Sequence, residues 1–206
     1  MSEYKLFYCD KMKKRYQNYI MALIVLMGLT SIYSCTKDSA KTQSLNAKEI
    51  SLYLYSIRRN EDSLTLYLNK SIADNNQLGK LYAYRLLGNY QREHARFTEA
   101  ISSHQSELEV ALKLNDTIDI IQALNNLGTD FRRVGALTEA SDYHYRALDY
   151  AETYSGLETN AGMKNRVVSL NGIGNVSLSL GYYDEAKKYF EDALKDEIKL
   201  GSPIGQ

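Results

Sequence analysis

Three segments of this 206-residue chain carry the same pair of landmarks. Each has a glycine preceded by Leu or Ile, and an alanine twelve residues after that glycine. The pairs are Gly88 and Ala100, Gly128 and Ala140, and Gly174 and Ala186, offset by 40 and then 46 residues. A period of roughly 20–50 residues is typical of arrays in which each unit packs only on its neighbours. The chain is therefore expected to form a repeat array, a kind of fold that usually holds a partner.

Each copy divides into two segments whose apolar residues recur at helical spacing. In the first copy the spacing predicts a helix over about residues 78–93 and a second helix beginning near Phe97. Gly135 and Gly181 mark the turn between the two helices in the later copies. No stretch alternates over the length of a strand, and the one proline is Pro203, so the sequence predicts an all-α fold.

The predicted architecture is an α-solenoid of antiparallel helix pairs. Residues 77–206 would hold the array of three repeats, and residues 48–76 a degenerate helix pair or cap whose apolar positions include Leu52, Tyr55, Leu64 and Leu68. By the logic of the repeat another helix should begin near Gly201. We therefore expect the natural protein to continue with more repeats or a different module.

The residues at fixed places in each copy resemble the tetratricopeptide repeat (TPR). That family carries a large residue, a Leu-Gly pair, an aromatic residue, and then Ala, an aromatic residue and Ala. The second copy supplies Leu124, Leu127-Gly128, Phe131, Ala140, His144 and Ala147. The first copy departs from the pattern at Gln91 and Glu107, and the period exceeds the family's 34 residues. The resemblance covers about residues 78–200 and implies a TPR-like superhelix.

The resemblance also implies a concave groove, lined by the first helix of each pair, that holds a protein or peptide partner. At the helix positions that face this groove in the family, the residues expected to contact the partner are Arg85, Asn89, Arg92, Asn125, Arg132, Asn171 and Asn175. Asn offers a donor and an acceptor to a peptide backbone, and Arg offers a fork for carboxylates. The spacing Arg85-x-x-x-Asn89 is similar to that of carboxylate-clamp members of the family. The alternative interpretation is that these side chains only solvate an open helix face.

The N-terminus has the layout of an export signal. A basic cluster over residues 11–15 precedes an apolar run over residues 20–29, and small and polar residues lead to Cys35. Ile32-Tyr33-Ser34-Cys35 resembles a bacterial lipobox, which implies a signal peptide over residues 1–34, a lipid on Cys35 and a tether over residues 35–47. A plain secretory signal and a retained anchor helix are the alternatives. A true start at Met12 would give a tighter signal and would remove Cys9.

Charge and chemistry narrow the function classes. The chain has a formal net charge of zero, and the part after residue 34 is mildly acidic, so no nucleic-acid partner is expected. Cysteines occur only at positions 9 and 35, which excludes a cysteine metal site in the body. His104 and His144 share one repeat position and are interpreted as core residues, because zinc needs further ligands. No catalytic motif, metal or cofactor is expected, so the chain is predicted not to be an enzyme.

Two functions remain at this stage. The first is a non-enzymatic lipoprotein of the bacterial cell envelope, membrane-anchored and facing the periplasm or the outer membrane, whose groove binds a protein or peptide. The second is the exported sensory region of a signalling or transcription-regulatory protein that continues into a membrane helix and an effector module. A membrane-spanning segment downstream of residue 206 would favour the second.

Overall fold

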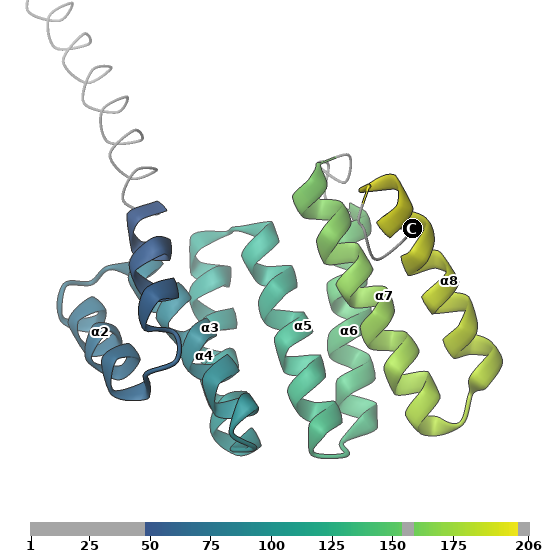
Figure 1. The fold of residues 1–206 in the computed structure, drawn as a ribbon, viewed down its shortest axis with the longest axis horizontal. Helices are drawn as coiled ribbons and strands as arrows, with labels where there is room; N and C mark the ends of the chain where they lie inside the picture. Colours follow the sequence, from purple (N-terminus) through teal and green to yellow (C-terminus); the bar gives the residue numbers. More distant parts are fainter. Residues whose placement is uncertain (1–47, 154–158, 202–206) are drawn as a thin grey trace, which may run out of the picture. The chain divides into compact units, whose positions relative to one another are not determined.

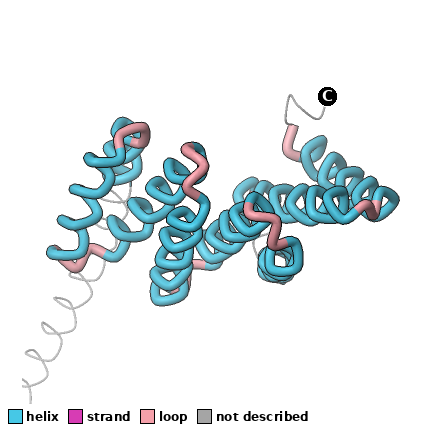
Figure 2. The backbone as a smooth tube through the Cα atoms, turned by 90° about the horizontal axis from the view of Figure 1, so that it is seen from below, coloured by secondary structure: helices cyan, strands magenta, loops and turns pink. Residues whose placement is uncertain are grey.

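A computed structural model of the chain describes residues 48–153 and 159–201, and these are helical apart from short turns (Figure 1). Residues 48–57 are helical, and seven further helices follow: α2 (Glu61–Ala73), α3 (Gln77–Glu93), α4 (Phe97–Leu114), α5 (Thr117–Arg133), α6 (Leu137–Thr153), α7 (Asn160–Leu180) and α8 (Tyr183–Lys199). No strand occurs among the described residues (Figure 2). The predicted all-α class and the predicted helix pairs are confirmed. The proposed signal peptide, Cys35 and the whole of the proposed tether lie outside the described residues.

The helix ends follow from local sequence. Asp116 accepts a hydrogen bond from the backbone N–H of Asp119 and caps the start of α5. Thr159 accepts one from the backbone N–H of Gly162 and caps the start of α7. The turn before α6 contains Gly135 and the turn before α8 contains Gly181, with φ of 80° and 82°. Glycine adopts this left-handed conformation without steric cost, which explains why these two turns carry it.

Within residues 50–201 each helix packs on the next one in the chain, and α5 also packs on α7. The first helices of the pairs, α3, α5 and α7, are called the A helices below, and α4, α6 and α8 the B helices. The contact between α5 and α7 joins successive A helices, so the units stack as the solenoid prediction requires. The fold is an α-solenoid of antiparallel helix pairs.

Residues 48–57 and α2 are both helical and share a cluster of buried apolar side chains. Leu64 and Leu68 of α2 are buried as expected. In residues 48–57, however, Ile50 and Leu54 are buried while Leu52 and Tyr55 are more than half exposed. Leu52 and Tyr55 therefore share the apolar helical spacing but face outward, because this short segment is apolar on several sides and its periodicity does not fix which side packs.

Side chains of the B helices pack directly against the landmark glycines of the A helices. A Cβ atom on Gly128 would lie 2.7 Å from the imidazole of His144, and a Cβ on Gly174 would lie 2.7 Å from the Phe190 ring. The His144 ring is also approached by Gly172 of the next A helix, where a Cβ would clash with it. His144 is thus packed between the backbones of α5 and α7, and no larger residue than glycine fits at either point.

Candidate functional site

The seven predicted groove residues all lie on the A helices, but the structure divides them. Arg85 and Asn125 are buried, with 9% and 3% of their surface exposed. The other five are half-buried: Asn89, Arg92, Arg132, Asn171 and Asn175. The division matters because a buried side chain already engaged within the array cannot also face a partner.

Arg85 joins three helices. Its Nε donates to Glu107 Oε1 of α4 at 2.5 Å, and its Nη2 donates to Asp119 Oδ1 of α5 at 2.8 Å. Burial lowers the pKa of Arg85, but the two carboxylates outweigh burial and raise it above its usual value. The guanidinium is therefore a fixed positive charge inside the array, and its role is to hold α3, α4 and α5 together.

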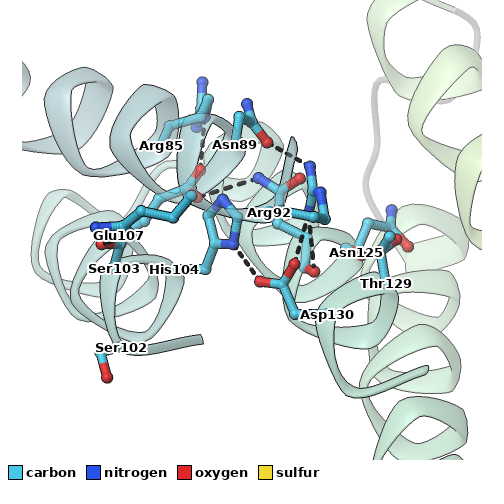
Figure 3. Close-up of polar contacts among 12 residues, drawn as sticks. Arg85, Asn89, Arg92, Ser102, Ser103, His104, Glu107, Asn125, Thr129 and Asp130 are labelled. Atoms are coloured by element: carbon cyan, nitrogen blue, oxygen red, sulfur yellow. Dashed lines mark hydrogen bonds and ion pairs between the residues drawn. The ribbon is translucent and has the colours of Figure 1, made fainter. Parts of the chain in front are cut away.

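Arg92 anchors a second buried cluster around Asp130 (Figure 3). Its Nη1 donates to Asp130 Oδ1 at 2.9 Å, and its Nη2 donates to Asn89 Oδ1. The other carboxylate oxygen of Asp130 accepts a hydrogen bond from His104 Nδ1 at 2.5 Å. Asp130 is fully buried and the Arg92 side chain is largely so, and the ion pair between Arg92 and Asp130 is therefore little screened by water. The cluster fixes Arg92 and Asn89 in position at the edge of the helix face.

The two departures of the first copy from the repeat pattern are explained by these contacts. Gln91 stands where an aromatic residue is expected, and its Oε1 accepts a hydrogen bond from Ser103 Oγ at 2.7 Å. Glu107 stands where alanine is expected, and besides Arg85 it accepts a hydrogen bond from Asn126 Nδ2 at 3.1 Å. The first copy has replaced apolar packing with matched polar pairs, so it is not merely an eroded repeat.

A relay of hydrogen bonds joins the second and third copies. Ser169 Oγ donates to the backbone carbonyl of Asn165 at 3.0 Å and accepts from Asn125 Nδ2 at 2.9 Å. Asn125 Oδ1 then faces His144 Nδ1 at 3.0 Å, so the imidazole donates from Nδ1. Its Nε2 is buried without a hydrogen-bond partner among the described residues. Burial, with a smaller contribution from nearby Arg132, lowers the pKa of His144 to about 4.

His104 and His144 are core residues, as the sequence predicts, although each also makes a polar contact that phenylalanine could not make. Within the described ranges no group of three or more His, Cys, Asp or Glu side chains is arranged to hold a metal ion. None of the helices described there is both long and apolar enough to cross a bilayer.

A set of half-buried polar residues on the A helices forms the candidate binding face. We define this A-helix face by Asn89, Arg92, Gln122, Thr129, Arg132, Asn171 and Asn175. It offers amide and hydroxyl groups together with two guanidinium groups. Arg132 makes no ion pair with any residue that the structure describes. Burial and the neighbouring Arg133 lower its pKa, so a carboxylate arriving there would relieve an unbalanced charge.

The acidic partners of Arg85 and Arg92 are not apparent from the sequence. Asp119, Asp130 and Glu107 are distant in sequence from Arg85 and Arg92, and a single sequence does not show which charges meet. The one available signal is that Glu107 and Asp130 fall among the apolar positions of their helices. A charge at such a position points to a buried partner.

Comparison with known proteins supports the fold. The family model for the tetratricopeptide repeat matches residues 120–158 and 166–202, which correspond to the second and third copies. The match bears out the resemblance over the copies that it covers. No curated protein matches the sequence.

Among solved structures, the crystal structure of BtubC (BKLC) from P. vanneervenii is similar, with a TM-score of 0.59 and 16% identity. The likeness covers 70% of this chain and 58% of BtubC, so the chain corresponds to little more than half of that protein. A crystal structure of MamA gives a TM-score of 0.45 at 18% identity, covering 74% of this chain and 87% of that one. At such identities the likeness to BtubC concerns the fold alone.

Proposed function

We propose that this chain is a non-enzymatic lipoprotein of a bacterial envelope whose helical array binds a protein or peptide through the A-helix face. The observation that carries the proposal is the division among the A-helix polar residues. Arg85 and Asn125 are occupied inside the array, whereas the residues of the A-helix face are partly exposed on three successive A helices. Tetratricopeptide repeats support a protein partner.

The A-helix face is held rigid by the buried contacts beneath it, and this favours partner binding. The buried clusters around Arg85 and Asp130 and the relay through Asn125 connect neighbouring copies, so the exposed groups between them are held at fixed spacing. A partner meeting a preorganised surface loses less conformational entropy than one that must order the surface first. Asn and Gln side chains on the face supply both donors and acceptors, as an extended peptide backbone needs.

Site-specific photocrosslinking tests the face. A photoreactive amino acid at Thr129 or Asn175 should give a discrete adduct with a partner in cells that make the protein naturally. Ser102 and Asp142 are exposed on α4 and α6 and serve as matched positions on the B helices. We expect no adduct from them. Adducts from the B-helix positions alone would place the partner elsewhere and contradict the proposal.

The anchor is tested separately. Cys35→Ala should abolish incorporation of labelled fatty acid and release the chain from the membrane fraction, because acyl chains supply the membrane affinity of a lipoprotein. Cys9→Ala is the matched control and should change neither readout. A Cys35→Ala protein that stays in the membrane would favour a retained anchor helix over lipidation.

A further inference from the structure

A polar cavity of about 380 Å³ lies where residues 58–59 meet α3. We call it the arginine pocket; it is lined by Arg58, Arg59, Leu86, Asn89, Tyr90, Arg92 and Glu93. Three guanidinium groups against one glutamate leave the lining net positive. The pocket touches the A-helix face through Asn89 and Arg92, whereas Arg58 and Arg59 lie in the turn after the helix of residues 48–57. All of its lining residues precede the segments that match the repeat family.

The arginines of the pocket are held by different means. Arg58 Nη1 donates to the backbone carbonyl of Tyr55 at 2.5 Å, and its guanidinium lies 3.6 Å from the centre of the Tyr55 ring. One of its five N–H donors is used by this bond, so the others remain available. Arg59 is exposed and makes no ion pair with a described residue.

Arg92 and Asn89 are fixed by the cluster around Asp130 (Figure 3). The bond from Arg92 Nη2 to Asn89 Oδ1 uses the acceptor of the Asn89 amide, which leaves its Nδ2 donor available. Asp130 neutralises Arg92 from the buried side, but nothing described balances Arg58 and Arg59. The pocket therefore presents several donors and an excess of positive charge, and it has one acidic group, Glu93.

We infer that the arginine pocket binds a carboxylate, supplied by an acidic side chain of the partner protein. Guanidinium groups bind carboxylates through paired charge-assisted hydrogen bonds, and a preformed set of donors makes the binding selective for an anion. The inference rests on the proposed function, since it names the chemistry of the partner's contact. It also moves the expected anion contact from Arg85, which is engaged with Glu107 and Asp119, to Arg58 and Arg59.

The probe is acetyl-tetraglutamate amide carrying a zwitterionic rhodamine, with the corresponding tetraglutamine peptide as its neutral match. Binding to the full chain in neutral detergent is followed by fluorescence anisotropy at low ionic strength. We expect tetraglutamate to bind and tetraglutamine not to bind. Replacing Arg58 and Arg59 together by Gln should weaken tetraglutamate binding by about tenfold or more, because charge-assisted hydrogen bonds are lost.

The control is the double variant Arg146→Gln/Lys187→Gln, which removes two exposed positive charges from α6 and α8. It should bind tetraglutamate within about twofold of the wild type, because exposed charges far from a site are screened. Equal weakening in the two double variants, or none in Arg58→Gln/Arg59→Gln, would overturn the inference. Displacement of tetraglutamate by inorganic phosphate at far lower concentration than by acetate would also overturn it in favour of a phosphate ligand.

The peptide titration and the crosslinking experiment can give negative results independently of each other. Crosslinks at Thr129 without tetraglutamate binding would contradict the inference that the arginine pocket binds a carboxylate, and would leave the proposed function intact. Tetraglutamate binding without any cellular crosslink would support a carboxylate site and remove the proposed partner-binding role of the A-helix face.

Discussion

Asp130→Ala should destabilise the array by about 3–5 kcal/mol, the range for removing one partner from a buried ion pair. The reason is that Asp130 is fully buried and serves two partners, Arg92 and His104. Without the carboxylate, Arg92 and His104 would still be withheld from water but would lose the hydrogen bonds to Asp130 that offset this cost. Urea unfolding of the full chain in neutral detergent, followed by circular dichroism at 222 nm, should show a lower midpoint than the wild type.

Asp142→Ala is the matched control for this experiment. Asp142 pairs with Arg146 at 3.5 Å on the surface of α6, and 64% of its side chain is exposed. Such a pair contributes less than about 1 kcal/mol, so the midpoint should hardly move. Asp130→Asn retains one acceptor and should fall between the two, which keeps the test readable if Asp130→Ala does not fold. A loss in Asp130→Ala no larger than that in Asp142→Ala would show that the cluster does not stabilise the fold.

Acid should weaken the array through His144. Its folded-state pKa is lowered to about 4, whereas an unfolded histidine has a pKa of about 6.5. Between these values the unfolded chain binds a proton that the folded chain does not, so stability is complete above pH of about 6.5 and falls as the pH drops toward 4. The full difference corresponds to about 3 kcal/mol.

His144→Gln isolates this contribution. Glutamine does not titrate, and its amide can still donate to Asn125 Oδ1. The stability difference between wild type and His144→Gln should shift by about 3 kcal/mol against the wild type from pH 7 to pH 4. His94→Gln is the control for the substitution itself, since His94 is exposed in the turn after α3 and its replacement at pH 7 should change the stability little. A difference that stays constant over this range would refute the role of His144.

The helix pairs were predictable because their signals are local and periodic. Spacing placed the first A helix at about residues 78–93, and the structure has it at Gln77–Glu93. The landmark glycines also mark a contact between the paired helices that was not among the predictions. The side chains opposite Gly88, Gly128 and Gly174 are His104, His144 and Phe190, each sixteen residues later. That constant interval is visible in the sequence and would have identified the contact.

The division of the polar A-helix residues was not predictable. Arg85 and Arg92 lie on the same helix, and the repeat pattern predicts that both face the groove. What buries Arg85 is the presence of Glu107 and Asp119 on two other helices. Such a pairing depends on how three helices meet, and a single sequence carries no record of it. The A-helix face could therefore be located by position, whereas its accessible members required the structure.

The contacts across copies also limit how this array could have grown. His144 needs a glycine from its own pair and a second glycine, Gly172, from the following pair. Arg85 likewise requires Asp119 on the next A helix. A unit copied or inserted between these partners would separate them and leave a buried charge or a blocked ring. The copies are therefore not interchangeable, since each depends on residues that only its present neighbour supplies.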